Sequence, residues 1–444
     1  PRHPKRVVGC NQAVRWYPQR TMKNIGIKSL LIGVLATVLL FTPLIMADNW
    51  PAWRGPNHTG ESTSGKYPAD LVDPANLAWK LPLTDKGCST PIVWDNQIFI
   101  TGPKDGQDTV TAISWEGKVL WEKSISKERR GKHRNGSGSN PSCITDGEVV
   151  FAYFKSGNLA ALSLDGKLLW KENLMSYGRD SLFWDFGTSP VLTKKHVIMA
   201  LMRNGNSWLV AFEKGTGKVA WKMERNFKTP SEGDHSYATP IVTTQNGREA
   251  ILVWGAERFT AHDAANGNIL WSCAGFNPAS KNNWVVVSSF VVIDDKAVIP
   301  YGRGARLAGI ELNGKGDVTL THRKWTLEGK GAFVPSPAAH GGKVYLVRDR
   351  GEVLCVNPKD GTIVWQNAFP KNRASYYSSP TIADGKIYSA REDGMLFVAS
   401  IKSGFKLLAE NDMGERIIAS PVPVNSSLLI RGEKHLFCFR QKSQ

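Results

Sequence analysis

The stretch Leu159–Trp170 reads Leu-Ala-Ala-Leu-Ser-Leu-Asp-Gly-Lys-Leu-Leu-Trp and predicts a β-hairpin. Strand-favouring residues run up to Asp165-Gly166, a pair suited to a tight turn because glycine adopts a positive φ without strain. A second strand then ends at Trp170. The same pattern, in which a turn glycine stands four residues before a final tryptophan, recurs at 112–121, 211–221, 261–271 and 355–365.

A second signal lies upstream of each hairpin, where a proline flanked by small polar residues opens an apolar run. The positions are Pro91, Pro141, Pro190, Pro240, Pro337, Pro380 and Pro421, with Phe290 replacing proline between Pro240 and Pro337. These positions define eight units, and each unit reads as four short strands. Because a single sheet cannot bury both of its faces until blades pack around an axis, the repeat predicts an all-β, eight-bladed β-propeller.

The two ends of the repeat region complete each other. Leu77–Lys80 matches the last strand of a unit, whereas 420–440 matches only the first three strands and has no final tryptophan. We therefore expect the N-terminal strand to pair into the C-terminal blade, which removes an open sheet edge.

One column of the aligned units is expected to hold the core between blades. Seven tryptophans fall in this outer-strand column, with Leu408 in the remaining unit: Trp79, Trp121, Trp170, Trp221, Trp271, Trp325 and Trp365. A neighbouring column requires a small residue and contains Ala112, Ala161, Ala211, Ala261, Gly309, Ala399, Cys355 and Cys438. Since a buried thiol packs as a small hydrophobe, we interpret these two cysteines as packing residues.

The N-terminal region divides into three predicted parts. Residues 1–21 carry basic residues and no acid, and are interpreted as a non-native extension upstream of Met22. Residues 22–47 combine a basic start, an apolar run and a cleavage position after Ala47, which predicts a signal peptide; an uncleaved membrane anchor is the alternative. Residues 48–75, which include the segment NWPAWRGPNHTGES, are expected to form a coil packed on the propeller at 76–441.

Charge and cysteine content indicate the compartment. Seven basic residues and no acidic residue precede Asp48. Removal of this segment on export lowers the formal net charge from +17 to +10. For a periplasmic or secreted protein, this charge predicts that the binding partner is an envelope protein or an anionic or carbohydrate ligand. Nucleic acid is not expected as a partner. Membrane contact is expected only if the signal segment is uncleaved. Lysines that merely guard blade edges are the alternative explanation. The five remaining cysteines leave at least one unpaired.

The chain resembles the pyrroloquinoline-quinone-like (PQQ-like) repeat propellers over nearly all of residues 76–440. The motif that carries the resemblance appears as AFEKGTGKVAW and ALSLDGKLLW. This family includes quinoprotein dehydrogenases, the outer-membrane assembly protein BamB and sensor regions of bacterial kinases. The opening NWPAWRGP also resembles exported propellers of planctomycete-type bacteria. The resemblance therefore implies an architecture, and the function must follow from the sites.

For a quinoprotein dehydrogenase, the resemblance implies PQQ, a calcium ion, a carboxylate base and often adjacent cysteines. The sequence has no Cys-Cys pair, and Asp294-Asp295 falls at an expected turn. It also lacks His-Glu-x-x-His, Gly-x-Ser-x-Gly and a complete phosphate-binding loop. We therefore predict no cofactor, no metal site and no catalytic residues, with PQQ and calcium remaining the alternative.

The binding surface is predicted from loop lengths. The glycine turns of the hairpins should lie at one end of the ring, and the loops between blades at the other. The first four of these interblade loops are longer than the rest, and binding residues concentrate on such loops. These loops carry the candidates His133, Arg134, Trp184, Asp185, Asp234, His235, Asn283 and Trp284. The alternative is that the loops only pack together and close the channel.

These features predict an exported, non-catalytic propeller that binds a ligand or a protein in the cell envelope. The alternative is a PQQ-dependent dehydrogenase.

Overall fold

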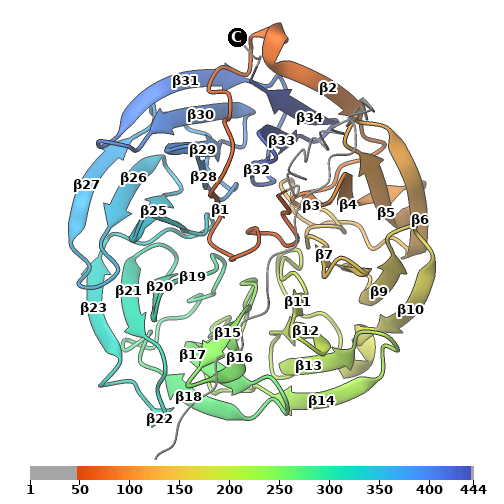
Figure 1. Cartoon of the computed structure of the whole chain (residues 1–444). Helices are drawn as coiled ribbons and strands as arrows, with labels where there is room; N and C mark the ends of the chain where they lie inside the picture. The colour runs from red at the N-terminus through yellow and green to blue at the C-terminus, as the bar shows by residue number, and fades with distance from the viewer. Residues whose placement is uncertain (1–47, 442–444) are drawn as a thin grey trace, which may run out of the picture. The chain divides into compact units, whose positions relative to one another are not determined.

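The computed structural model describes residues 48–441, which form eight β-sheets arranged as the blades of a propeller (Figure 1). The predicted all-β, eight-bladed fold is therefore confirmed. The predicted extension at 1–21 and signal peptide at 22–47 lie outside the described residues. No helix within 48–441 is long and apolar enough to cross a membrane.

Blades one to four follow one another along the chain. Blade one contains β3 (Ile92–Trp94), β4 (Gln97–Lys104), β5 (Gln107–Ser114) and β6 (Val119–Lys127). Blade two contains β7 (Ile144–Thr145), β8 (Val149–Tyr153), β9 (Asn158–Ser163) and β10 (Leu168–Asn173). Blade three contains β11 (Val191–Leu192), β12 (His196–Leu201), β13 (Trp208–Glu213) and β14 (Val219–Glu224). Blade four contains β15 (Ile241–Gln245), β16 (Arg248–Gly255), β17 (Arg258–Asp263) and β18 (Ile269–Cys273), extended by β22 (Gly316–Asp317).

Blades five to eight complete the ring. Blade five contains β19 (Val291–Ile293), β20 (Lys296–Tyr301), β21 (Arg306–Glu311) and β23 (Arg323–Glu328). Blade six contains β24 (Ala338–His340), β25 (Lys343–Val347), β26 (Glu352–Val356) and β27 (Ile363–Ala368). Blade seven contains β28 (Thr381–Ala383), β29 (Lys386–Ala390), β30 (Met395–Ser400) and β31 (Lys406–Asp412), with β1 (Glu61–Ser62) at its inner edge. Blade eight contains β32 (Val422–Val424), β33 (Ser427–Arg431), β34 (His435–Arg440) and β2 (Leu77–Pro82).

Two short 3-10 helices lie between the strands. They are η1 (Pro74–Asn76), which precedes β2, and η2 (Leu174–Tyr177), which follows β10.

The ring closes as the sequence predicts. Strand β2 pairs antiparallel with β34, and Trp79 lies opposite Cys438. In Figure 1 these strands, from the two ends of the coloured trace, lie side by side. The C-terminal blade therefore has no open outer edge of the kind that promotes aggregation.

The tryptophans of this column join neighbouring blades. The Trp121 indole donates a hydrogen bond to the Leu164 carbonyl of blade two at 2.9 Å. It also covers Gly166, where an added Cβ would lie 2.6 Å from the ring. The same contact places Trp170 against Gly217 and Trp325 against Gly361. The turn glycine is therefore required twice, for its positive φ and for the indole of the preceding blade.

The small-residue column lies opposite these tryptophans. In blade two the register aligns Phe151, Ala161 and Trp170, and in blade six it aligns Tyr345, Cys355 and Trp365. Cys355 and Cys438 are thus buried packing residues, and all five cysteines in the described chain are free thiols.

Blade seven corrects the predicted alignment of this column. The residues in register with Thr381 and Tyr388 are Val398 and Ala409, each one position away from the predicted Ala399 and Leu408. The large and small side chains have exchanged places, since the smaller Ala409 occupies the tryptophan position. Alignment by residue type misplaced the column because it assumed that every blade keeps its large residue on the outer strand.

The segment from Asp48 to Ser62, a coil that ends in strand β1, crosses the centre of the ring (Figure 1). Trp50 pairs through its backbone with Val93 of blade one, and the Pro51 carbonyl accepts a hydrogen bond from the Thr145 amide of blade two. Farther along the coil, the Gly60 carbonyl accepts from the Ile382 amide of blade seven. The coil thus satisfies backbone groups on the inner strands, which have no other strand beside them.

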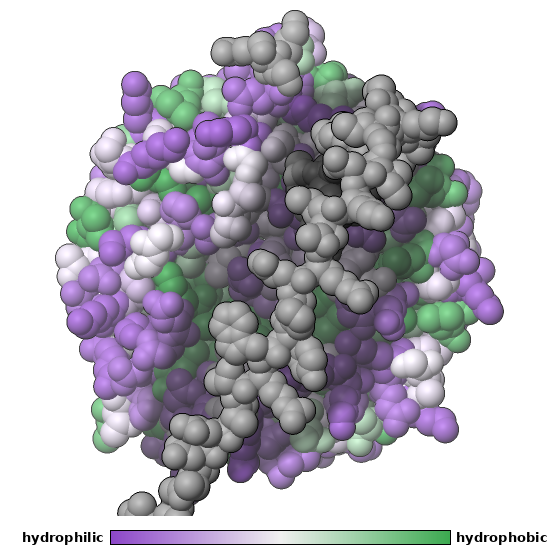
Figure 2. All heavy atoms as spheres, viewed as in Figure 1, coloured by the Kyte–Doolittle hydropathy of each residue, from purple (hydrophilic) through white to green (hydrophobic). Residues whose placement is uncertain are grey.

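The outer face of the ring is mixed in polarity. Figure 2 shows hydrophobic side chains scattered singly among hydrophilic ones at the margin of the ring. Outer strands expose Val119, Leu169, Val219, Ile269 and Val364. Isolated apolar residues of this kind are normal on protein surfaces.

Candidate functional site

A cavity with a volume of about 650 Å³ lies on the propeller axis. Trp53 of the coil lines it, as do residues from the inner strands and from the turns opposite the glycine hairpins, such as Arg303 and Asp349. The coil pairs with the inner strands near the other end of the ring. The cavity is therefore a cup, with a floor at the coil and a mouth at the interblade loops, and its volume is typical of small-molecule sites.

A closed ring of hydroxyl groups surrounds this cup. One serine or threonine per blade accepts a hydrogen bond from the corresponding amide of the preceding blade, at distances of 2.8 to 3.2 Å. In blade order these residues are Thr90, Ser142, Ser189, Thr239, Ser289, Ser336, Ser379 and Ser420. Thr239 and Ser289 excepted, all of them line the cavity.

The hydroxyl ring corrects one predicted position. Ser142 is the member from blade two, so that the residue after it, Cys143, takes the place that proline holds in most other blades. The predicted opening residue of this blade, Pro141, precedes the column by two positions. Phe290, by contrast, follows Ser289 of the ring and occupies the predicted proline position of blade five.

At the mouth, the loop between β6 and β7 is fixed by a buried carboxylate. Asp185 accepts hydrogen bonds from the backbone amides of Lys132, at 2.7 Å, and His133, at 3.0 Å. It also forms a buried ion pair with the ammonium group of Lys155. Asp185 therefore positions the loop and has its charge neutralised within the protein.

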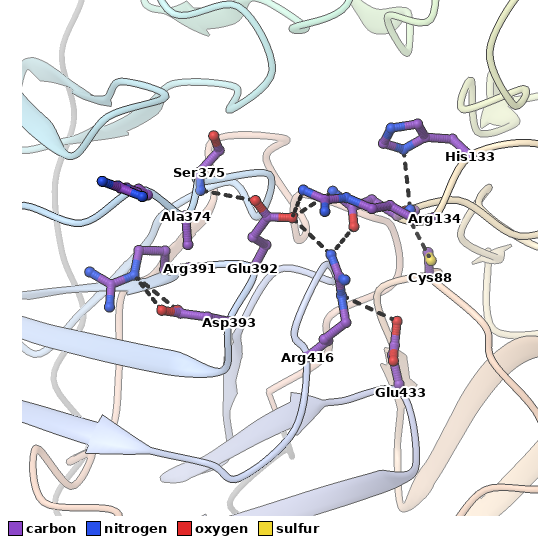
Figure 3. Close-up of polar contacts among 12 residues, drawn as sticks. Cys88, His133, Arg134, Ala374, Ser375, Arg391, Glu392, Asp393, Arg416 and Glu433 are labelled. Carbon is purple, nitrogen blue, oxygen red and sulfur yellow. Dashed lines mark hydrogen bonds and ion pairs between the residues drawn. The ribbon is translucent and has the colours of Figure 1, made fainter.

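A second carboxylate holds the mouth across blades seven and eight (Figure 3). Glu392 accepts from the Arg416 guanidinium and the Asn135 amide, both at 2.8 Å, and from the Ser375 backbone amide at 3.1 Å. Arg134 approaches the same carboxylate at 3.5 Å. These residues come from four separate segments of the chain. Glu392 of blade seven therefore holds the long loop that follows blade one, which reaches over blade eight.

Aromatic side chains line part of the mouth. Trp184 is 47% exposed and meets His133 edge-on at 5.1 Å between ring centroids. His133 in turn lies 6.5 Å from the ring of Tyr377. Aromatic faces of this kind suit the apolar face of a sugar ring or another ring-containing ligand.

The lining of the mouth also carries two guanidinium groups. Arg303 lies 4.4 Å above the ring of Phe333, and Arg350 donates to the Arg373 carbonyl at 2.6 Å. Within residues 48–441 neither is paired with a carboxylate. Asp349 lies nearby in the chain, but it accepts from the backbone amides of Phe333 and Val334. The two guanidinium groups of the lining thus have no carboxylate partner in the described chain, whereas its carboxylates are already bonded to donors.

Two further titratable groups in the cavity stay neutral at physiological pH. Burial raises the pKa of the Cys88 thiol, and this outweighs the opposing effect of Arg431. Burial likewise raises the pKa of the Tyr376 phenol. Neither group therefore supplies an anionic nucleophile or base to the cavity.

The predicted candidates separate into two groups in the structure. His133, Trp184 and Asp185 line the axial cavity, and Arg134 lies beside them at the Glu392 cluster with its side chain 68% exposed. The remaining candidates, Asp234, His235, Asn283 and Trp284, do not line it. They bond to other parts of the protein: Asp234 accepts from the Gly205 amide in the turn between β12 and β13, and Trp284 donates to the Phe276 carbonyl of its own loop.

Sequence reasoning missed most of the second half of the cup. Trp53, Arg303, Phe333, Asp349, Arg350 and Tyr377 all line the cavity and come from the coil or from short turns and loops. The emphasis on long loops overlooked them. A usable signal was present, since a basic residue follows the second strand in most blades, as at Arg303 and Arg391.

Comparison with known proteins identifies the family. A family model described as "Outer membrane protein assembly factor BamB" matches residues 70–206, 180–324 and 317–439. The chain belongs to this family. No curated protein matches it in sequence.

Solved structures share the architecture at low identity. BamB from Moraxella catarrhalis is 14% identical with a TM-score of 0.62, covering 82% of this chain and 99% of its own. A quinohemoprotein alcohol dehydrogenase from Comamonas testosteroni is 13% identical with a TM-score of 0.64, covering 89% and 81%. A europium-containing methanol dehydrogenase is 12% identical with a TM-score of 0.65, covering 89% and 98%. These similarities establish the fold of this BamB-family chain.

The quinoprotein structures raise the question whether the residues here fit a quinone held by calcium. Calcium requires six to eight oxygen ligands, with carboxylates prominent among them. The lining carboxylates, Asp185 and Asp349, are already occupied by amide and ammonium donors. In the part of the chain that the structure describes, no three His, Cys, Asp or Glu side chains group closely enough to hold a metal ion. The cavity therefore does not fit a carboxylate-bound calcium.

Proposed function

We propose that the chain is an exported, non-catalytic binding module of the cell envelope whose axial cup takes an acidic carbohydrate. The observation that carries this proposal is the composition of the cup. Aromatic rings and two guanidinium groups without a carboxylate partner in the described residues line the mouth, and hydroxyls surround the axis.

Each element of the cup matches one property of such a ligand. Trp184 and Tyr377 offer faces on which a pyranose ring can stack. Arg303 and Arg350 supply donors for a carboxylate, and the fork of a guanidinium suits this planar group. The formal charge of +10 that follows from the predicted export attracts an anionic ligand at long range.

The test is calorimetric titration of the purified protein with a galacturonate trimer. The matched neutral probe is a galactose trimer. We expect measurable binding of the acidic trimer only, weakened at least tenfold by Trp184→Ala and by the double change Arg303→Gln with Arg350→Gln. Arg248→Gln is the control, because Arg248 starts β16 in the turn that follows β15, at the glycine-hairpin end of blade four.

Two outcomes would overturn the proposal. Equal binding of the neutral and acidic trimers would remove the role of the arginines. Binding of an acidic peptide, with neither trimer bound, would make a segment of a protein partner the ligand of the cup.

A further inference from the structure

The hydroxyl ring has an uneven balance of donors and acceptors. Each of its eight oxygens accepts a hydrogen bond from a backbone amide, yet within residues 48–441 none of the eight hydroxyls donates to a protein acceptor. A serine or threonine hydroxyl carries one proton to donate. The ring therefore surrounds the axis with unused donors.

Arg54 of the coil shows the same imbalance next to the ring. Its Nη2 atom donates to the Pro380 carbonyl at 2.7 Å and to the Pro337 carbonyl at 3.2 Å. These prolines directly follow the ring residues Ser379 and Ser336. The guanidinium thus lies at the level of the ring, between blades six and seven, and its neighbour Trp53 lines the cavity.

The remaining nitrogen atoms of Arg54 have no protein acceptor. The residue is only 4% exposed, and both Nε and Nη1 are buried without a partner in the described chain. No carboxylate of residues 48–441 forms an ion pair with it, and burial lowers its pKa to about 9. A buried, charged donor that lacks an acceptor is costly and requires an explanation such as a bound ion.

Another buried arginine shows what a purely structural guanidinium looks like. Arg225 is 1% exposed, but its donors reach the carbonyls of Gly255, Val253 and Arg258 and the hydroxyl of Thr260. Arg54 is also buried, but within residues 48–441 only one of its nitrogens, Nη2, has hydrogen-bond partners, and both partners are carbonyls. The difference is that Nε and Nη1 of Arg54 lack a protein acceptor in the described chain, while its Nη2 atom is held at the carbonyls that directly follow the ring residues Ser336 and Ser379.

We propose that the floor of the axial cup is an oxyanion site, in which Arg54 and the neighbouring hydroxyls of Ser336 and Ser379 bind a phosphate, sulfate or carboxylate group. Such a group carries only acceptors in its ionised form, which matches a surface that carries only donors. The charge of the anion also compensates the buried guanidinium. This site does not require the saccharide proposed for the mouth, since a free anion could fill it.

The experiment begins with crystals of the full-length protein grown with selenate, a sulfate analogue located by its anomalous signal. We expect an anomalous peak within hydrogen-bond distance of Arg54 and of the Ser336 or Ser379 hydroxyl. A floor filled with water alone, or a peak elsewhere only, would overturn the proposal. This readout needs no variant and so does not depend on the folding of one.

Affinity measurements then assign the donors. Sulfate, phosphate and acetate are titrated separately at constant ionic strength, with binding followed by calorimetry. Arg54→Met should weaken the preferred anion at least tenfold, and Ser336→Ala with Ser379→Ala several-fold, whereas Arg225→Met should leave its affinity unchanged. An unchanged affinity in Arg54→Met would contradict the assignment.

A second floor variant keeps the arginine but displaces it. A Cβ added at Gly60 would lie 2.0 Å from Nη2 of Arg54, so Gly60→Ala must move the guanidinium. We expect it to weaken anion binding as Arg54→Met does. Mouth variants such as Trp184→Ala should leave sulfate binding intact, so that failure of the floor site and failure of the saccharide site are separable.

Which anion is the natural occupant follows from a competition experiment. If sulfate displaces the galacturonate trimer, the sugar carboxylate reaches the floor. If both bind together, the floor holds a separate inorganic anion. Either result retains the floor site, and loss of all anion binding in the wild-type protein would refute it.

Discussion

The floor and the mouth of the axial cup are built in opposite ways. The floor repeats a serine or threonine in every blade, and this hydroxyl ring leaves donor protons unused. The mouth is assembled from loops that occur once each, and its acidic residues, Asp185 and Glu392, are surrounded by donors. The repeated hydroxyls of the floor thus form a uniform surface for an anionic group, and the loops of the mouth determine which other ligand groups can enter the cup.

The largest expected effect concerns the walls that both ends share. Trp271 is completely buried between blades, and removal of a buried indole leaves a cavity. Trp271→Ala should lower the free energy of unfolding by about 3–5 kcal/mol. Trp184→Ala at the exposed mouth should cost less than about 0.5 kcal/mol. Urea melts that gave equal losses would show that the tryptophan column is not the core between blades.

A smaller loss is expected where the mouth depends on a buried charge. Asp185→Asn leaves the ammonium of Lys155 buried without its counter-charge. The free energy of unfolding should fall by about 3 kcal/mol, as when one partner of a buried pair is removed. The control is Glu122→Gln, whose partner Lys104 is solvent-accessible, with less than about 1 kcal/mol expected. Equal effects in chemical denaturation would contradict the structural role of Asp185.

The packing column should tolerate a conservative change. Cys355 faces Trp365, as alanine faces tryptophan in blades one to four. Cys355→Ala should therefore cost at most about 1 kcal/mol and leave ligand binding unchanged. Burial raises the pKa of this thiol, which also keeps it unreactive towards alkylating reagents in the folded protein. Loss of binding in the variant would show that Cys355 does more than pack.

The smallest effect concerns the attachment of the coil that forms the floor. His340 of blade six bonds to Glu61 at 2.6 Å, and this contact raises the pKa of the imidazole. The pKa of His340 is therefore higher in the folded state than in the unfolded state. The contact's contribution to the free energy of unfolding is complete below the ordinary histidine pKa and disappears as pH rises through the raised value. The difference in unfolding free energy between wild type and Glu61→Gln should be a few tenths of a kcal/mol at pH 5.5 and vanish near pH 9. A difference that grew with pH would have the wrong sign.

The repeated features of the molecule could be predicted from sequence, and the unique features could not. The eight blades, the closure by Leu77–Lys80 and the position of Phe290 followed from residue spacing. The hydroxyl ring was also visible in outline, because serine or threonine precedes proline in most blades. Alignment by proline alone nevertheless misplaced Pro141, since it ignored the hydroxyl that is bonded across the blades.

The site was only partly accessible because its residues converge in space from turns of different blades. His133, Trp184 and Asp185 were reached through loop length, whereas Arg303, Arg350 and Tyr377 lie in short segments that carry no such signal. The partners of Glu392 come from loops up to 258 residues apart in the chain. Contacts at that separation depend on the closure of the ring and not on any local pattern.

The most direct test of the account is a crystal structure of the protein grown with the galacturonate trimer. We predict density for the trimer in the axial cup, with a pyranose ring against Trp184 and carboxylate oxygens within hydrogen-bond distance of Arg303, Arg350 or the hydroxyl floor. A trimer bound only on the outer face of the ring, with the cup empty of it, would contradict the account.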